Sequence, residues 1–293
     1  MTGEMDMSGL IRVFCVLAMG MLVMTGFVAS AEDSIEYTVG DEWVYSMTME
    51  IDPMTLTGMF TYSVEGVTTE TVAGVTYDVY DLALDGSMSI EGEIENFTID
   101  GSATITGSYS MDLESLDEIR SETNLSIEMD IEGLLSAEMW EYTLVTYSPP
   151  GGVGDVPEDP EEGDSWVVTY TAYSESMSFD SMSDLGIETA SESETETRTY
   201  TYVRTETVTV PAGTFECEVV QVDDGASIET RWECEEVGAY VKSVFDSDST
   251  EDTEMVLESY SYAAGEADDD GMTLYVIIGA VADTPIATSW PCC

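Results

Sequence analysis

The chain lacks histidine and is poor in basic residues, with 6 Lys and Arg against 61 Asp and Glu among 293 residues and a formal net charge of -55. Without histidine, Ser-His-Asp and Cys-His nucleophile systems are excluded, as are the imidazole ligands of catalytic zinc. Without a basic surface, phosphate binding driven by counterion release is excluded, so we expect no nucleic-acid partner. The negative side chains repel one another in dilute salt, and concentrated salt screens this repulsion. The composition therefore favours a halophilic-like protein that works in a saline environment.

Lysine and leucine are scarce, whereas Thr, Ser, Val and Tyr recur in alternating runs that are typical of strands. Hydrophobic residues make up 43% of the chain and aromatic residues 10%, more than a disordered polyanion carries. We therefore expect an all-β, mainly antiparallel protein with few short helices, whose core lies beneath an acidic surface.

The only long apolar run lies at the start of the chain. Residues 1–31 are typical of a secretory signal peptide with its signal helix, because Arg12 precedes the run Val13–Val28 and small residues at 29–31 suit cleavage. The alternative is an uncleaved anchor. We expect export to the cell surface or the extracellular space.

A shorter apolar run, residues 272–282, follows an acidic spacer at 263–271. It is too short for a membrane helix, which needs about 20 apolar residues. Together with the tail to residue 293, it resembles the start of a C-terminal membrane anchor that is lost or incomplete, so membrane association is an expectation. The alternative is a last strand.

The clearest local signal is a β-hairpin within Val208–Ser243. Alternating runs flank Asp224-Gly225, a residue pair suited to a tight turn. Folding the arms about this turn sets Val219 opposite Trp232 and Cys217 opposite Cys234. Because disulfides persist in exported proteins, we predict a Cys217–Cys234 disulfide; the alternative is two buried thiols.

Three sequence blocks recur in the same order, which favours an internal duplication over chance alternation. We predict two tandem curved-sheet or half-barrel units at 32–148 and 163–262, joined by a Pro/Gly/acidic linker at 149–162. The matching blocks are Gly40-Asp41-x-Trp43 with Gly163-Asp164-x-Trp166, Ala73-Gly74 and Asp85-Gly86 with Ala212-Gly213 and Asp224-Gly225, and the octapeptides beginning at Glu141 and Glu254.

Within the units, we expect the strands of the first to break at Asp85-Gly86 and at Asp100-Gly101. Met111–Arg120 is compatible with a short helix. The Ser- and Glu-rich segment Ser174–Thr199 is typical of a long loop or of edge strands.

Three weak candidate sites remain. Oxygen ligands at alternate positions suit a hard cation such as Ca²⁺, although a solvated acidic turn is the alternative; these ligands are Asp246, Asp248, Thr250 and Asp252. Two glycosylation sequons begin at Asn96 and Asn124. Aromatic residues on alternating strand positions are expected in the core, or as the lining of an apolar-ligand site in a curved sheet; they are Trp43, Trp166, Phe215 and Trp232.

The second unit resembles exported domains related to the lipoprotein-carrier (LolA-like) β half-barrel. The resemblance covers about a hundred residues and rests on structural motifs. It implies a curved antiparallel sheet and, by analogy, lipid or lipoprotein handling. Its motifs are Gly163-Asp-x-Trp166, Pro211-Ala-Gly-Thr-Phe215, Trp232, Gly238-x-x-Val-Lys242 and Leu257-x-x-Tyr260, of which the first unit keeps only Gly40-Asp-x-Trp43 and Ala73-Gly74.

These patterns favour a non-enzymatic cell-surface or envelope protein of the archaeal acidic type, with a structural or interaction role and no firm cofactor. The alternative is a carrier or sensor that binds a lipid or another apolar ligand on the inner face of the sheet. A carboxylate glycoside hydrolase is the remote alternative, because among 61 acids some pair always looks suitable.

Overall fold

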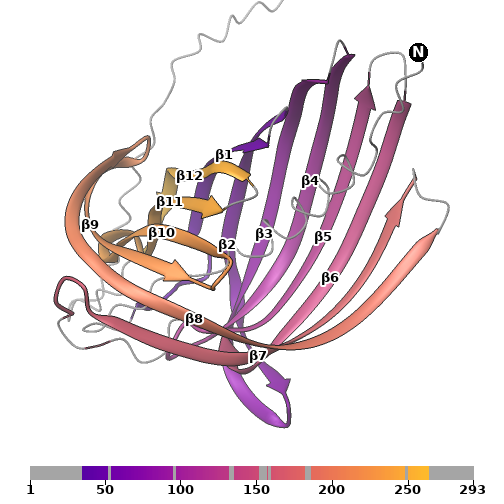
Figure 1. Ribbon diagram of the computed structural model, residues 1–293. Coiled ribbons are helices and arrows are strands. Elements are labelled where there is room, and N and C mark those ends of the chain that lie inside the picture. Colours follow the sequence, from indigo (N-terminus) through magenta and orange to yellow (C-terminus); the bar gives the residue numbers. More distant parts are fainter. Residues whose placement is uncertain are drawn as a thin grey trace, which may run out of the picture.

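The computed structural model describes residues 35–263, with gaps at 52–53, 95–96, 132–134, 152–156, 158–159, 182–185 and 248–249. Twelve antiparallel strands follow one another in chain order and close into one barrel, because β1 pairs with β12 (Figure 1). The predicted signal segment and the apolar tail lie outside the described residues. Within the described ranges, no helix has the length and apolar character needed to cross a membrane.

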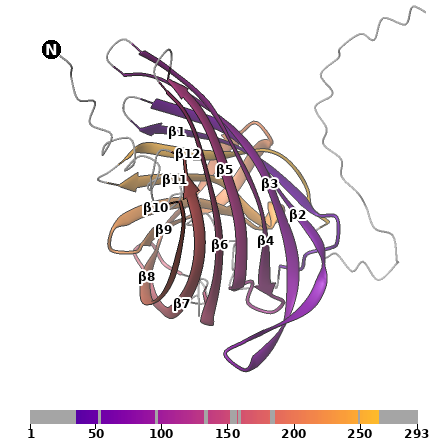
Figure 2. The same cartoon turned by 90° about the vertical axis from the view of Figure 1, so that its right-hand side faces the viewer.

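Following the duplication predicted from the sequence, we call the first six strands the first repeat and the rest of the barrel the second repeat. The first repeat consists of β1 (Glu42–Ile51), β2 (Met54–Val72), β3 (Val75–Ile94), β4 (Phe97–Asp112), β5 (Glu118–Ile131) and β6 (Leu135–Gly151). The second consists of β7 (Ser165–Asp180), β8 (Ile187–Val210), β9 (Gly213–Asp223), β10 (Ser227–Cys234), the short 3-10 helix η1 (Glu235–Val237), β11 (Ala239–Ser247) and β12 (Thr250–Ser261). In Figure 2, strands β8 to β2 run side by side across the front of the view.

The period-2 pattern of the sequence explains why these segments are strands. In β5, Leu125, Ile127 and Met129 are buried, whereas Glu128 and Asp130 between and beyond them are exposed. One face of the strand therefore packs into the barrel and the other carries the acids to solvent. The all-β antiparallel prediction is confirmed.

The prediction of two separate half-barrels is wrong. Two open half-barrels would each leave unpaired strand edges, and such edges tend to pair with whatever strand is available. Here β6 pairs with β7 from Met139↔Asp180 to Ser148↔Thr171, and β1 pairs with β12, so the repeats complete each other as one barrel.

The two repeats begin with the same backbone turn. Gly40 N–H donates to Val64 O at 2.9 Å, and Gly163 N–H donates to Tyr202 O at 2.9 Å. Both glycines have positive φ, +97° and +93°, which side-chain-bearing residues rarely adopt. This equivalence supports the duplication predicted from the sequence.

The predicted hairpin register is confirmed, since Trp232 lies opposite Val219. The predicted breaks in the first unit are wrong, because Gly86 lies within β3 and Gly101 within β4. Gly86 serves close packing instead: a Cβ there would lie 2.5 Å from a Phe60 ring carbon.

Two further local expectations are corrected by the structure. Between β4 and β5 the chain makes a tight turn instead of a helix, because the Asp112 carboxylate accepts hydrogen bonds from the Glu114 and Ser115 amides at 3.0 and 2.9 Å. For Ser174–Thr199 the long loop is wrong and the alternative of edge strands is right in part: most of the segment belongs to the long strands β7 and β8, and part of β8 is paired on one side only among the described residues.

A chain of tyrosine rings crosses the barrel interior. Tyr240 stacks on Tyr45 with centroids 5.0 Å apart, Tyr45 meets Tyr62 at 6.0 Å, and Tyr62 meets Tyr109 at 6.0 Å. The Tyr45 hydroxyl donates to Tyr240 O at 2.9 Å. Side chains of β11, β1, β2 and β4 therefore fill the space that the barrel encloses at this level.

The barrel is closed along only part of β8. Strand β9 pairs with β8 from Thr199↔Asp223 to Val210↔Gly213, whereas β7 pairs with β8 from Ile187 to Thr201. The segment Ile187–Arg198 therefore has a strand neighbour on one side only among the described residues. We call this segment the free edge; it is the outermost strand on the right of Figure 1.

Candidate functional site

The four aromatic residues, expected in the core or as the lining of an apolar-ligand site, lie in different surroundings. Trp43 is fully buried and donates its indole N–H to Val237 O at 2.8 Å. Trp166 stacks on Tyr200 in a separate small cluster. Trp232 projects from the other face of β10, where its indole N–H donates to Glu206 at 2.5 Å and the Lys242 ammonium lies over its ring.

Phe215, the fourth of these residues, belongs to a layer formed where the β8–β9 hairpin curls over β10–β12. Ala212 N–H donates to Leu257 O at 3.1 Å, and the Phe215 ring lies 5.9 Å from that of Tyr260, although β10 and β11 separate β9 from β12 in the barrel order. The Cys217 and Cys234 sulfurs are buried here at disulfide-bonding distance, 1.97 Å. The pairing of these cysteines thus agrees with the sequence-based register.

The other predicted sites are not assembled by the structure. Asp246 is exposed on β11, Thr250 and Asp252 lie on β12, and Asp248 lies outside the described residues. No group of three or more metal-binding side chains occurs in the part of the chain that the structure describes. Asn124 is exposed at the centre of β5, and Asn96 lies outside the described residues. Cation binding and glycosylation stay predictions.

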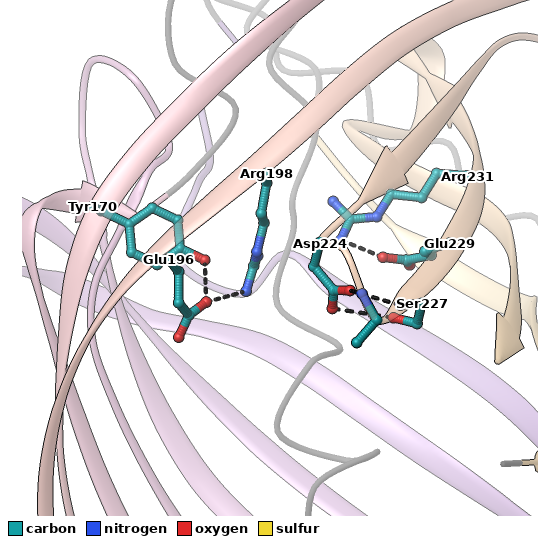
Figure 3. Close-up of polar contacts among 8 residues, drawn as sticks. Tyr170, Glu196, Arg198, Asp224, Ser227, Glu229 and Arg231 are labelled. Carbon is teal, nitrogen blue, oxygen red and sulfur yellow. Dashed lines mark hydrogen bonds and ion pairs between the residues drawn. The ribbon is translucent and has the colours of Figure 1, made fainter. Parts of the chain in front are cut away.

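The structure instead gathers charged and polar side chains where β9 turns into β10 and leaves the edge of β8, and they range from buried Glu229 and Arg231 to exposed Asp224. We call this group the junction cluster (Figure 3); it comprises Tyr170, Glu196, Arg198, Asp224, Ser227, Glu229 and Arg231. Four strands and the β9–β10 turn contribute to it or to its contacts, since Ser243 of β11 also donates to Glu229. Two of the chain's 6 basic residues therefore meet in one place.

One half of the junction cluster is an ion pair in the barrel interior. The Arg231 guanidinium contacts Glu229 Oε2 at 2.6 Å, and the Ser243 hydroxyl donates to Glu229 Oε1 at 2.6 Å. Arg231 is only 1% exposed. Burial opposes its charge, but the Glu229 carboxylate more than compensates and raises the pKa of Arg231. The guanidinium is therefore held charged away from solvent.

The other half is centred on Glu196 of β8. Its carboxylate accepts a hydrogen bond from the Tyr170 hydroxyl at 2.8 Å and contacts Arg198 at 3.4 Å. The Arg198 guanidinium also lies over the Tyr170 ring, 5.2 Å from its centroid. Figure 3 shows Arg198 and Arg231 on either side of the Asp224 turn.

The third part of the junction cluster is the turn at Asp224. One Asp224 carboxylate oxygen accepts hydrogen bonds from the Ala226 and Ser227 amides at 2.8 and 2.7 Å. Burial opposes the charge on Asp224, but these two donors lower its pKa. The carboxylate therefore fixes the hairpin turn at which β9 stops pairing with β8.

Glu233 lies on the same face of β10 as Glu229 and Arg231 and is 6% exposed. Burial raises its pKa to about 7, although the nearby Arg231 charge acts in the opposite direction. Glu233 Oε1 and Arg231 Nε are buried and have no hydrogen-bond partner among the described residues. This face of β10 thus carries two buried polar atoms whose hydrogen-bonding capacity is not met by the described residues.

The space beside the junction cluster is small. A cavity of about 10 Å³, lined by Arg198, Asp224, Glu229 and Arg231 among others, is large enough for about one water molecule. A sugar ring or lipid needs far more room, since ligand pockets occupy about 300–1,000 Å³. The cluster can therefore hold charges in fixed positions, but it offers no substrate cleft.

Sequence reasoning missed these residues because acids are everywhere in the chain. The available signal was the triplet Glu-Thr-Arg, which occurs at 196–198 and again at 229–231. In a strand, residues two apart share a face, so each triplet places an arginine beside an acid. Because the chain has so few basic residues, two copies of this triplet indicate that both Glu-Arg pairs have a specific role.

A shallow groove of about 470 Å³ lies across the outer face of β6, β7 and β8. It is lined by Tyr142, Glu175, Ser176, Met177, Thr189, Ala190 and Ser191. The last three residues belong to the free edge, so the groove adjoins the unpaired side of β8. Met177 and Ile187 nearby are large apolar residues with exposed fractions of 39% and 61%.

No protein-family model matches the chain, and no curated protein matches it either. The resemblance to the lipoprotein-carrier half-barrel is therefore not confirmed by a family match. Among solved structures, the chain is similar to a predicted lipoprotein from Parabacteroides distasonis, with 12% identity and a TM-score of 0.30, covering 79% of this chain and 100% of that one. It is also similar to a predicted exported protein with a YmcC-like fold from Bacteroides fragilis, with 11% identity and a TM-score of 0.30, covering 80% and 99%. A TM-score of 0.30 is too low for either structure to indicate the fold or the function of this chain.

Proposed function

We propose that this is an exported, non-enzymatic protein of the cell surface or envelope, with a structural or interaction role. The observation that carries the proposal is the set of large side chains buried inside the first repeat. Trp43 and Tyr45 are fully buried, and Met47 is 1% exposed. A carrier needs an open apolar cavity, whereas a structural or interaction module fills that space with its own side chains.

A carrier or sensor for a lipid or other apolar ligand is the second candidate. The number of strands favours this candidate. Eight strands enclose an interior that side chains can just fill, whereas this barrel has twelve strands and therefore encloses a wider interior. Methionines on the inner face could also adapt to a ligand, since this side chain is flexible; they include Met47, Met49, Met54, Met88 and Met129.

The glycosidase alternative is disfavoured by the arrangement of the inward acids. Glu229 is held by Arg231 and Ser243, and the adjoining cavity has a volume of about 10 Å³. Two carboxyl groups that flank a glycosidic bond need room for a sugar ring between them. The junction cluster provides charge pairing instead of a cleft.

Native mass spectrometry of the mature chain, purified from its own host in its own salt, tests the proposal. We expect the mass of the polypeptide alone. A lipid or isoprenoid that copurifies in stoichiometric amount would overturn the structural role and establish the carrier. The variant Tyr62→Ala provides a control, because removing a ring from the tyrosine chain creates a cavity that should bind a small apolar probe where the parent protein does not.

A further inference from the structure

The free edge of β8 presents an unpaired row of backbone groups. In an antiparallel ladder, residues along a strand direct their N–H and C=O groups alternately to its two neighbours. From Ile187 to Arg198 the ladder to β7 is continuous, and β9 begins pairing only at Thr199. About half of the backbone groups in this segment therefore point to a side where the described residues place no strand.

This edge is open to solvent on both faces. Every residue from Ile187 to Thr195 is exposed. The edge ends at the junction cluster, where the Asp224 turn carries the chain from β9 into β10. Beside this segment, none of the described residues takes the place that β9 occupies further along β8, and the geometry of that place is already set by a long and regular β7–β8 ladder.

Charge differs between the two faces of the free edge. On the face that continues the barrel interior, β8 carries four acids; they are Glu188, Glu192, Glu194 and Glu196. On the outer face it carries uncharged hydroxyl side chains, and Thr195 and Thr197 pair there with Thr171 and Thr169 across the ladder at 3.4 and 3.2 Å. The same face also carries Ala190 and, at the end of the edge, Arg198, so a strand added here would set most of its alternate side chains beside a carboxylate.

A second copy of the chain is a poor occupant of this edge. Antiparallel pairing of two free edges would bring the two rows of glutamates together, and like charges on neighbouring strands are destabilising. Acidic side chains along an edge are a known means of preventing such self-pairing. A strand that carries positive charges would instead be attracted, because its Lys or Arg side chains would lie beside the glutamates of the free edge.

We propose that the free edge of β8 binds an extended segment of a partner protein by antiparallel strand addition, and that this segment carries Lys or Arg at every second position. Backbone hydrogen bonds supply affinity, and the alternating charge supplies selectivity. On the outer face, the alternate side chains of the segment lie along the row of hydroxyl groups, next to the groove that contains Met177. This inference rests on the interaction role proposed above and names the class of partner.

The test uses the full mature chain and a short synthetic peptide in which Lys alternates with Val. We expect the peptide to bind in low salt, to weaken as salt screens the charges, and to increase hydrogen-exchange protection of amides within residues 187–198. A Glu-Val peptide should not bind. A Lys-Val peptide with an N-methylated backbone keeps the charge but cannot donate to the edge, so it should bind about tenfold more weakly or worse.

Charge reversal on the edge provides the matched variants. Glu192→Lys together with Glu194→Lys should weaken binding about tenfold or more, a loss of about 1.4 kcal/mol or more. The control is Glu128→Lys with Asp130→Lys on β5, which makes the same change in net charge on exposed positions of a strand paired on both sides; its binding should stay within about twofold.

Equal binding by the two variants, or equal binding of the N-methylated peptide, would overturn the proposal by showing that net charge alone attracts the peptide. Protection of the edge by self-association, without peptide, would overturn it in favour of a second copy. These readouts are independent of the mass-spectrometric test for a lipid. A bound lipid would refute the structural role and leave the edge result standing, whereas a failed peptide assay would refute the edge and leave that role in place.

Discussion

The two repeats of the barrel begin identically and are filled differently. In each, a positive-φ glycine and an aspartate open the first strand, and a tryptophan follows two residues later. In the first repeat Trp43 is fully buried and Asp41 is 3% exposed, accepting a hydrogen bond from Ala263 N–H at 3.0 Å. In the second, Trp166 is partly exposed and Asp164 is exposed. The same backbone turn thus precedes a fully buried tryptophan in one half and a partly exposed tryptophan in the other.

This difference follows from what each strand faces. The inner residues of β1–β5 pack against one another in the main cluster of the protein, whereas Tyr200 and Val222 belong to a small satellite cluster. Beside this small cluster the inner face carries two ion pairs, Arg198 with Glu196 and Arg231 with Glu229. The sheet opens in the same region, because β8 extends past the point at which β9 leaves it.

The comparison is sharpest at the two equivalent tryptophans. Trp43→Ala should lower the free energy of unfolding by about 3–5 kcal/mol, because it empties a fully buried site and leaves Val237 O without its indole donor. Trp166→Ala should cost less than half as much, since that ring is already partly in water. Urea denaturation of both variants measures the difference, and equal losses would contradict the contrast between the halves.

The disulfide occurs only in the second repeat. Replacing Cys217 and Cys234 together by alanine should lower the free energy of unfolding by about 3 kcal/mol, because the reduced chain gains conformational freedom when unfolded. Mass spectrometry under denaturing conditions, with and without reductant, reports whether the parent protein contains the bond. Free thiols in the protein from its native host would show that no disulfide contributes to its stability.

Two glycines that look equivalent in sequence should respond differently to substitution. Gly86→Ala forces a Cβ to within 2.5 Å of Phe60 and 2.8 Å of Ile105, so we expect a loss of about 1–3 kcal/mol from overpacking. Gly225→Ala meets nothing within 4 Å but must keep a φ of +87°, so its cost of about 1 kcal/mol is strain alone. Thermal unfolding distinguishes them, and a larger loss at Gly225 would be contrary to the assignment of Gly86 to a packed strand.

Glu233 should make the stability of the second repeat depend on pH. Burial raises its folded-state pKa to about 7 from an ordinary 4.5, so the folded protein binds the proton more tightly than the unfolded chain does. The resulting stabilisation is complete below pH 4.5 and is lost as the pH rises through about 7. Denaturation at pH 5 and pH 8 should therefore differ less in Glu233→Gln than in the parent, whereas the exposed control Glu128→Gln should keep the parental difference.

Local sequence patterns predicted the parts of this fold that depend on neighbouring residues. The hairpin at Asp224-Gly225, its register and the Cys217–Cys234 pairing follow from period-2 alternation and turn chemistry, and all three agree with the structure. The equivalent turns at Gly40 and Gly163 were likewise visible in the repeated Gly-Asp-x-Trp motif. These features need only residues that are close in sequence or copies of the same short block.

Long-range closure could not be predicted in the same way. Nothing in the sequence distinguishes a β6–β7 pair that joins two repeats from a linker that separates two domains, since Pro149 and Pro150 read as breakers yet lie in β6. The junction cluster was missed for a related reason: whether Glu229 and Arg231 face solvent or the interior depends on strands that are remote in sequence. Gly86 was misassigned because a glycine needed for packing looks the same as one needed for a turn.

The seam between β1 and β12 tests the central claim, that the two repeats form one closed barrel. Thr48 and Glu254 lie opposite each other across this seam. With Thr48→Cys and Glu254→Cys, a short bifunctional thiol reagent should cross-link the two positions within a single chain, whereas the control pair of Thr48→Cys with Glu128→Cys on β5 should not react. Mass spectrometry of the digested protein gives the answer: a cross-link specific to the seam pair is the predicted result, and equal yields for the two pairs would contradict a closed barrel.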